Sequence, residues 1–258
     1  KVVIIFQPAE EGFAGAKAMI NDGLLEKYPI DEIYGMHNMP GLEKGVLAIQ
    51  PGPRLAAADN FEIEILGKGA HGAMPSNSID PIVCGSSIVQ NIQHIVSRNA
   101  DPKETLVVTV ASFSSGKANN VIPSNAKMSG TIRYYNKEIG ELAKKRFYEV
   151  VNSTSLGFGA KVNINYMKGY PATINHVKQS EFALKTAKKV IGQKASSSQK
   201  PMMGSEDFSY FLEKVPGCFA WIGNGDSASL HNSKYDFNDD VLSIGSSFLA
   251  SLAEERLV

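Results

Sequence analysis

The sequence lacks several features that would assign it to a specialised class of protein. It has 258 residues, only two cysteines, and equal numbers of basic and acidic residues, 26 of each. A protein that binds nucleic acid usually presents a net basic surface, so this balance argues against a nucleic-acid partner. No apolar run is longer than the five residues of Val2–Phe6, far below the ~18 that a membrane span needs. The composition therefore excludes both nucleic-acid and membrane partners.

The two cysteines, Cys84 and Cys218, are far apart and show neither a paired nor a metal-binding spacing. Isolated thiols are typical of proteins in a reducing compartment, where cysteine behaves as a small buried apolar residue. We therefore expect a cytoplasmic protein in which both thiols are buried and unreactive.

The chain opens on apolar residues 2–6 and has no initiating methionine before them. A continuous apolar run that ends before Pro8 is typical of a parallel strand buried on both faces. We therefore interpret the sequence as the C-terminal part of a longer protein. A helix pattern at residues 14–20 and a strand pattern at 32–36 follow, which predicts a strand-helix-strand unit with parallel strands.

The sequence pattern changes near Asp59. Residues 61–65 alternate between apolar and polar side chains, as in a sheet with one solvated face. A helix, two strands, a helix and a strand are predicted next, at residues 80–98, 106–111, 126–134, 138–151 and 162–167. Their β-α-β-β-α-β order is that of the ferredoxin-like unit. We therefore expect residues 59–171 to form a complete small domain.

This small domain interrupts an α/β domain whose two parts are residues 1–58 and 172–258. The second part shows three helix patterns and one buried-strand run, at residues 179–191, 206–215, 239–256 and 218–222 respectively. Continuous apolar strands that alternate with helices are typical of an α/β fold. The sequence thus predicts an α/β protein with an inserted α+β domain.

Two adjacent carboxylates, Glu10 and Glu11, lie between the first predicted strand and helix. They fit the acidic first turn that a helix dipole favours, or a pair in which one binds a metal and the other moves protons. His37 and His231 each follow a predicted strand, and imidazole is the commonest metal ligand. Because parallel strands end at one sheet edge, Glu11, His37 and His231 form a zinc-type set. Each histidine alone also fits a structural role.

Three further candidates lie in the small domain. His71 is flanked by small residues that allow a backbone to approach a ligand closely, or it is a solvated turn histidine. Arg133 can grip a carboxylate with its planar fork or form a surface ion pair, and Asn120 lies in a turn. Outside this domain, residues 204–208 are typical of a helix start capped by Ser205. Alternatively, a carboxylate of this segment orients a histidine ligand.

Seven segments, in order along nearly the whole chain, carry a resemblance to one family. They are Gln7–Gly12, Gly35–His37, Gly69–Pro75, Asn120–Pro123, Gly130–Arg133, Met203–Phe208 and Leu230–Ser233 with Tyr235–Asn238. The chain resembles the metal-dependent amidohydrolases and peptidases that include hippurate hydrolase, N-acyl-L-amino-acid amidohydrolases and plant auxin-conjugate hydrolases.

The resemblance implies a zinc-aminopeptidase-like catalytic domain over residues 1–58 and 172–258. It implies that residues 59–171 are an inserted lid and dimerisation domain. The implied general base is Glu10, and the group implied to hold the oxyanion is His71. The implied metal ligands are Glu11, His37 and His231. The implied substrate contacts are Asn120 and Arg133.

The resemblance also implies two divalent metal ions, which can be zinc, manganese, nickel or cobalt. The family's remaining ligands lie in a Cys-x-His segment followed by a His-Asp pair, and neither Cys84 nor Cys218 has a histidine two residues later. We therefore expect that segment to precede Lys1. We further expect at most one metal ion in this chain, and poor activity when the chain is alone.

The expected reaction is hydrolysis of the amide bond of a small N-acyl amino acid such as hippurate, by a metal-activated water with Glu10 as base. A dipeptidase or deacetylase with the same mechanism is an alternative, and so is a non-catalytic remnant that serves only in dimerisation. The resemblance implies further copies of the chain as partners, in a homodimer or homotetramer formed through the lid.

Overall fold

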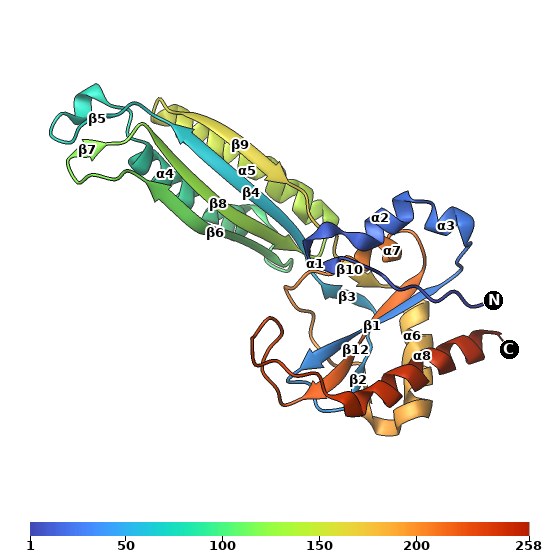
Figure 1. Cartoon of the computed structure of the whole chain (residues 1–258). Helices are drawn as coiled ribbons and strands as arrows, with labels where there is room; N and C mark the ends of the chain where they lie inside the picture. The colour runs from blue at the N-terminus through green and yellow to red at the C-terminus, as the bar shows by residue number, and fades with distance from the viewer. Residues whose placement is uncertain (258) are drawn as a thin grey trace. The chain divides into compact units, whose positions relative to one another are not determined.

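The computed structural model describes residues 1–257. It divides the chain into two compact units. Unit 1 consists of residues 1–56 together with the residues from Thr173 onward, and unit 2 consists of residues 57–172. None of the helices within residues 1–257 combines the length and the apolar character needed to cross a membrane. Figure 1 shows the elements of both units.

Unit 1 contains a four-stranded sheet in which most of the pairing is between distant segments. Its strands, in spatial order, are β1 (Ile33–Pro40), β12 (Gly217–Gly225), β2 (Leu47–Ala48) and β11 (Ala195–Ser196). β1 runs parallel to β12, and β2 is antiparallel to β12 and parallel to β11. β12 is buried along almost its whole length, as a central strand must be when both of its faces are covered.

Apolar side chains of β12 alternate between two clusters, one on each face of this sheet. Phe219 and Trp221 join the cluster that contains α2 (Gly15–Asn21) and α7 (Ser209–Leu212). Cys218, Ala220 and Ile222 join the cluster that contains α6 (Val177–Ile191) and α8 (Leu242–Leu257). The sheet is therefore covered by helices on both faces, which explains why the strand is continuously apolar.

The remaining elements of unit 1 are short. β3 (Gly52–Leu55) pairs with β10 (Thr173–Asn175) in a separate two-stranded antiparallel sheet. The others are α1 (Glu10–Phe13), α3 (Leu24–Lys27), η3 (Gly192–Lys194) and η4 (Asp239–Val241). Cys218 is buried in unit 1 and Cys84 is buried in unit 2, as expected from their isolation in the sequence.

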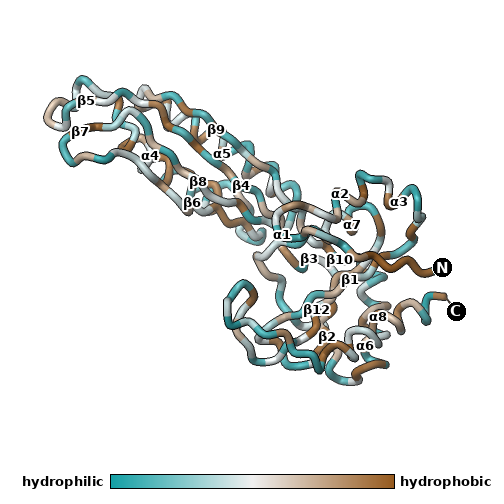
Figure 2. The backbone as a smooth tube through the Cα atoms, viewed as in Figure 1, coloured by the Kyte–Doolittle hydropathy of each residue, from teal (hydrophilic) through white to brown (hydrophobic). Residues whose placement is uncertain are grey.

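The prediction of a strand at residues 2–6 is wrong. Residues 1–9 contain no strand, although they form the apolar segment next to the N-terminus in Figure 2. Ile4 and Phe6 are 77% and 89% exposed. A strand needs a neighbour that bonds its N–H and C=O groups, and none of the strands within residues 1–257 pairs with this segment. The predicted strand-helix-strand unit is therefore absent, and the parallel neighbour of β1 is β12.

Unit 2 has the predicted β-α-β-β-α-β order. Its elements are β4 (Ala57–Leu66), α4 (Pro81–Asn91), β6 (Leu106–Ser115), β8 (Asn125–Tyr134), α5 (Lys137–Gly157) and β9 (Lys161–Met167). The strands form an antiparallel sheet in the order β6-β8-β4-β9. Figure 1 shows α4 and α5 on one face of this sheet. The predicted helix at 80–98 is divided into α4 and a π-helix, η2 (Ile95–Asn99).

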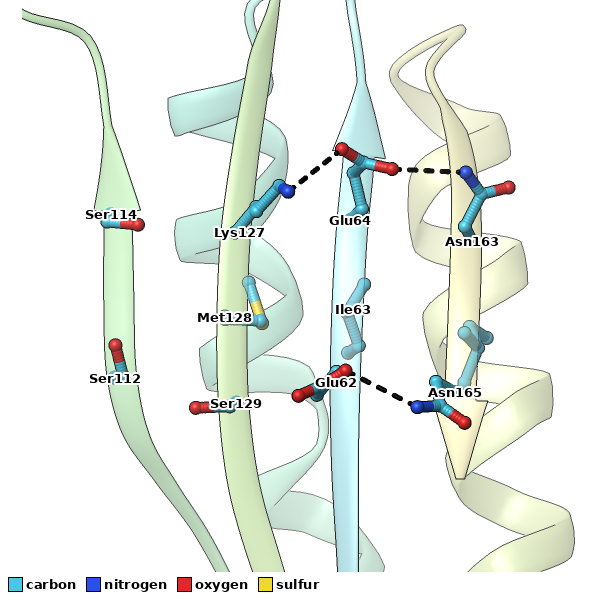
Figure 3. Close-up of a pocket in the computed structure, with 11 residues that line it drawn as sticks. Glu62, Ile63, Glu64, Ser112, Ser114, Lys127, Met128, Ser129, Asn163 and Asn165 are labelled. Atoms are coloured by element: carbon cyan, nitrogen blue, oxygen red, sulfur yellow. Dashed lines mark hydrogen bonds and ion pairs between the residues drawn. The ribbon is translucent and has the colours of Figure 1, made fainter. Parts of the chain in front are cut away.

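The alternation that predicted β4 separates two faces of the unit 2 sheet. Phe61, Ile63 and Ile65 are buried in the cluster that α4 and α5 cover. Glu62 and Glu64 lie on the opposite face. Figure 3 shows them with their partners: Asn165 Nδ2 donates to Glu62 at 3.3 Å, Asn163 Nδ2 donates to Glu64 at 3.2 Å, and Lys127 Nζ lies 3.5 Å from Glu64.

Two short paired strands extend unit 2 beyond the start of β8. β5 (Ala70–His71) pairs with β7 (Val121–Ile122), and η1 (Pro75–Asn77) follows β5. Figure 1 shows both strands at one end of the unit.

Candidate metal centre

The carboxylates Glu10 and Glu11 lie in α1, a single turn with an irregular backbone. Ala9 and Ala14, which flank α1, have φ angles of 54° and 53°, in the left-handed region that residues with a Cβ rarely adopt. Glu11 itself has ψ of 77°, outside the helical range. Strained backbone of this kind is concentrated at functional sites.

Glu10 belongs to a cluster of three carboxyl groups, which we call the acid cluster. Its other members are Glu206 and Asp207, and oxygen atoms of the three side chains lie within 4.8 Å of one another. Glu206 is 6% exposed and Asp207 is fully buried. The acid cluster brings together carboxylates from opposite ends of the sequence.

Backbone and side-chain donors hold the two buried members of the acid cluster in place. The N–H of Ala16, at the start of α2, donates to Asp207 Oδ2 at 2.9 Å, and the Gln7 amide donates to Asp207 Oδ1. The N–H of Phe208 donates to Glu206 Oε1 at 3.0 Å. These bonds fix the carboxylates toward Glu10 and leave further lone pairs for a ligand.

The three carboxyl groups bind protons more tightly than isolated ones. Burial raises the pKa of Glu206 to about 7, and the charges of Glu10 and Asp207 add to this rise. Burial also raises the pKa of Glu10, helped by the charges of Asp207 and Glu11, while His37 opposes the rise. Crowded buried carboxylates stabilise either a proton or a cation between them, so the donor set fits a divalent ion.

Glu11 and His231 approach each other at the surface of unit 1. His231 Nδ1 lies 3.8 Å from Glu11 Oε1, and both side chains are about three-quarters exposed. His231 follows β12 and has a φ of 62°, another left-handed backbone position. One carboxylate and one imidazole at this separation can ligate a common ion after a small movement of either side chain.

His37 lies inside β1 and not after its end, so the prediction that it follows the strand is wrong in that detail. Its register partner on β12 is Trp221. Its Nδ1 lies 2.6 Å from the carbonyl oxygen of Asn38. Because a carbonyl only accepts, Nδ1 carries the proton, and in the neutral ring Nε2 keeps a lone pair for a metal.

The candidate residues of unit 2 fall into two separate places. His71 pairs with Val121 across β5 and β7, and the N–H of Gly72 donates to the carbonyl of Asn120 at 2.8 Å, so His71 and Asn120 are neighbours. Arg133 lies eight residues along β8 from Asn125, at the opposite end of that strand. At ~3.4 Å per residue this separation is about 27 Å. The structure thus groups His71 with Asn120 and not with Arg133.

Arg133 is half-buried and contacts its own strand. Its Nη1 donates to the Thr131 hydroxyl. Burial lowers the pKa of Arg133, and the charge of Asp59 opposes that shift. By contrast His71 is exposed, and its Nδ1 accepts from the N–H of Ala73 at 3.1 Å.

The sequence interpretation missed the place of Glu206 and Asp207 in the acid cluster. It left two alternatives for residues 204–208, a helix start capped by Ser205 or a carboxylate that orients a histidine ligand. The helix start is wrong, because α7 begins at Ser209 and no side chain caps it. The two adjacent acidic residues directly before Phe208 were the feature of the sequence that could have pointed to this cluster. Their burial depends on contacts with residues near the N-terminus, which local sequence does not reveal.

Comparison with known proteins covers almost the whole chain. The model of Peptidase family M20/M25/M40 matches residues 1–255. Hippurate hydrolase of Campylobacter jejuni is 37% identical over 98% of this chain and 67% of its own length. N-acetyl-L-cysteine deacetylase of Bacillus subtilis is 35% identical over 100% of this chain and 61% of its own length. IAA-amino acid hydrolase ILR1-like 2 of Arabidopsis thaliana is 40% identical over 99% of this chain and 59% of its own length.

A solved structure supports the same relationship. The chain matches a dinuclear metal-binding peptidase of family M20 from Bacillus subtilis with a TM-score of 0.80 and 30% identity. This match covers 96% of the chain and 63% of that structure. The chain therefore spans about three-fifths to two-thirds of the length of these relatives.

Proposed function

Because this chain belongs to peptidase family M20/M25/M40, we propose that it is part of a metal-dependent amidohydrolase that cleaves N-acyl amino acids of the hippurate type. The observation that carries the proposal is that Glu11 lies beside His231, while Glu10, whose carboxyl group feels the charge of His37, adjoins two buried carboxylates. In this proposal unit 1 is the catalytic domain, and unit 2 is an inserted lid.

Three residues of unit 1 hold the metal in this proposal: Glu11, His37 and His231. The approach of Glu11 to His231 and the Nδ1–H of His37 bonded to a carbonyl both favour ligation. A bound divalent ion would lower the pKa of a water molecule and stabilise negative charge on the amide carbonyl oxygen. Zinc, manganese, nickel and cobalt all suit such a donor set.

Glu10 is the proposed general base. Its carboxyl group is partly buried and its pKa is raised, which makes it a stronger proton acceptor than a solvated glutamate. It takes the proton from the attacking water and passes it to the departing amine, so the carboxylate is regenerated in each cycle. His71 donates a hydrogen bond to the oxyanion of the tetrahedral intermediate.

Arg133 and Asn120 contact the substrate, with the guanidinium of Arg133 bound to its carboxylate. Asn125 and Arg133 are about 27 Å apart along β8, and His71 pairs with Val121 of β7, which precedes Asn125. We infer that His71 and Arg133 of one chain do not contact the same small molecule. We therefore assign His71 and Asn120 to the site of a second copy. A homodimer or a homotetramer provides that copy.

A longer protein supplies the rest of the centre in this proposal. The relatives are longer than this chain, and the dinuclear peptidase binds two ions. We assign the remaining ligands to a segment outside these 258 residues, so that the chain alone holds at most one ion and is poorly active. A dipeptidase or a deacetylase would use the same residues. The alternative in which the protein is not an enzyme is a non-catalytic dimerisation module.

The test is an assay of the longer protein against hippurate, an N-acetyl amino acid, an indole-acetyl amino acid and a dipeptide. Each substrate is measured after chelation and again after a divalent ion is restored. We expect metal-dependent release of the amino acid from the acylated substrates. Cleavage of the dipeptide alone would show that the protein is a dipeptidase and not an amidohydrolase of acylated amino acids. If no substrate is cleaved, the non-catalytic dimerisation module is the interpretation that remains.

A further inference from the structure

The segment that leads to Glu206 and Asp207 has little regular structure of its own. Over residues 197–208 it forms only an isolated bridge, between Met202 and Leu55. Over residues 199–204 its hydrogen bonds to the rest of unit 1 come from β3 and the residue that follows. The N–H of Met202 donates to the Arg54 carbonyl at 3.0 Å, and the N–H of Ala56 donates to the Gly204 carbonyl at 2.8 Å.

The side chain of Arg54 adds a third attachment to this segment. Its Nη1 donates to the carbonyl of Gln199 at 3.4 Å, and its Nη2 donates to the carbonyl of Ala48, in β2, at 3.4 Å. Its Cζ lies 3.3 Å from the ring centroid of Trp221, in β12. One guanidinium therefore connects the central sheet with the start of the segment.

Arg54 is an unusual residue for this position because it is fully buried and remains charged. None of the ion pairs within residues 1–257 includes it, and its Nε has no acceptor in the described part of the chain. Burial lowers its pKa to about 10, so the guanidinium is still protonated at neutral pH. Burial of an unpaired charge is costly, and an apolar side chain of similar length would pack here without that cost.

Arg54 also lies close to both parts of the proposed centre. Trp221, on which it stacks, is the register partner of His37. The segment that it holds ends in the two buried carboxylates of the acid cluster. A planar group that stacks on one face and donates in two directions suits this place, and lysine cannot reproduce that geometry.

We propose that Arg54 is a positioning residue whose guanidinium fixes residues 199–204, and thereby the two carboxylates that follow them, Glu206 and Asp207. Without this attachment residues 199–204 keep two backbone bonds, with Arg54 and Ala56. The carboxylates then keep only their own bonds from Gln7, Ala16 and Phe208, and they sample a wider range of positions around Glu10. The inference rests on the proposed metal centre for its functional consequence, but the effect on the segment is independent of any metal.

The test compares Arg54→Met, which keeps the length of the side chain, with Arg54→Lys, which keeps the charge. Phe248→Leu is the control, since Phe248 is 1% exposed in the other cluster of unit 1. Hydrogen exchange at residues 199–207 is measured in the metal-free protein, and metal affinity is measured by competition with a chelator. We expect Arg54→Met to increase exchange there and to weaken metal binding ~10-fold, Arg54→Lys to show a smaller loss, and the control to show neither change.

The outcomes separate this inference from the proposed function. Wild-type exchange and wild-type metal affinity in Arg54→Met would overturn the role of Arg54 while leaving the metal centre intact. A longer wild-type protein that binds no metal would overturn the proposed function, and the exchange of the metal-free variants would still decide the role of Arg54. Failure of both Arg54 variants to fold would contradict the inference as well, because Arg54 would then be needed by the whole of unit 1.

Discussion

His231 Nδ1 lies 3.8 Å from Glu11 Oε1, although the two residues come from opposite ends of the chain. Both side chains are exposed, and even a fully charged pair at an exposed position contributes at most about 1 kcal/mol to stability. Both residues also lie where the backbone is irregular, at α1 and at a left-handed position after β12. The pair therefore contributes little to folding, and the proposed function assigns it to metal binding.

The first prediction concerns the general base. Glu10→Gln keeps the size of the side chain but removes its ability to accept a proton, so turnover of an N-acyl amino acid by the longer protein should fall at least ~100-fold. Metal bound by Glu11, His37 and His231 should be unchanged, because Glu10 is not one of these three assigned ligands. Steady-state kinetics and elemental analysis check the two parts. Glu26→Gln, at an exposed position in α3, is the control, and retained turnover in Glu10→Gln would remove Glu10 from this role.

The second prediction concerns the copy of the chain in which His71 acts. Each of the two variants, His71→Ala and Glu10→Gln, should be inactive when all chains of the oligomer carry it. In a mixed dimer one site combines the intact Glu10 of one chain with the intact His71 of the other. Random mixing should therefore restore roughly a quarter of wild-type turnover for a dimer. Activity that stays at the level of the separate variants would place His71 in the site of its own chain.

The third prediction concerns the stability of unit 2. Asp59 is 3% exposed and accepts from Tyr166 Oη at 2.7 Å, Tyr134 Oη at 3.1 Å and the N–H of Gly169 at 3.1 Å. Asp59→Ala removes this acceptor from three donors, so the free energy of unfolding should fall by about 3 kcal/mol or more. Tyr166→Phe removes one of the bonds and should cost about 1 kcal/mol. Denaturant titration measures both, and equal losses would contradict the role of Asp59.

The fourth prediction concerns the pH dependence of stability in the metal-free protein. The pKa of Glu206 is about 7 in the folded chain, against an ordinary value of 4.5. The folded state therefore keeps a proton that the unfolded state has lost. Its stabilising contribution is complete below pH 4.5 and disappears as the pH rises through 7. For a shift of this size the contribution is on the order of 3 kcal/mol.

Glu206→Gln removes this titration while its side-chain oxygen still accepts from the N–H of Phe208. The difference in unfolding free energy between the two proteins should therefore change steadily from pH 4.5 to 7 and then become constant. Denaturant titrations across this range give the difference directly. Parallel pH profiles would show that Glu206 ionises as an ordinary carboxyl group.

Sequence predicts an element well when its pattern is local. The alternation at residues 61–65 identified β4 and the buried face of unit 2, because side chains in a strand point alternately to two sides. The same reasoning failed at residues 2–6, because strand formation there depends on a partner that their own sequence does not specify. It also did not predict the acid cluster, because the bonds from Gln7 and Ala16 to Asp207 and the approach of Glu10 join segments that are far apart in the sequence.

For the site, residue types and segment order predicted which side chains to examine but not how they are grouped. Glu11 and His231 do approach each other. However, the separation of His71 from Arg133 follows from where β5, β7 and β8 lie in the sheets of unit 2. Spacing along the sequence carries no information about that distance.

The central claim is that Glu11 and His231 bind a catalytic metal ion. The most direct test is the metal content of the longer protein, measured by elemental analysis after equilibration with divalent ions and dialysis. The wild-type protein is compared with a Glu11→Gln/His231→Asn double variant. The account predicts a bound ion in the wild type that the double variant loses. Equal metal content in the two proteins, or no metal in the wild type, would contradict it.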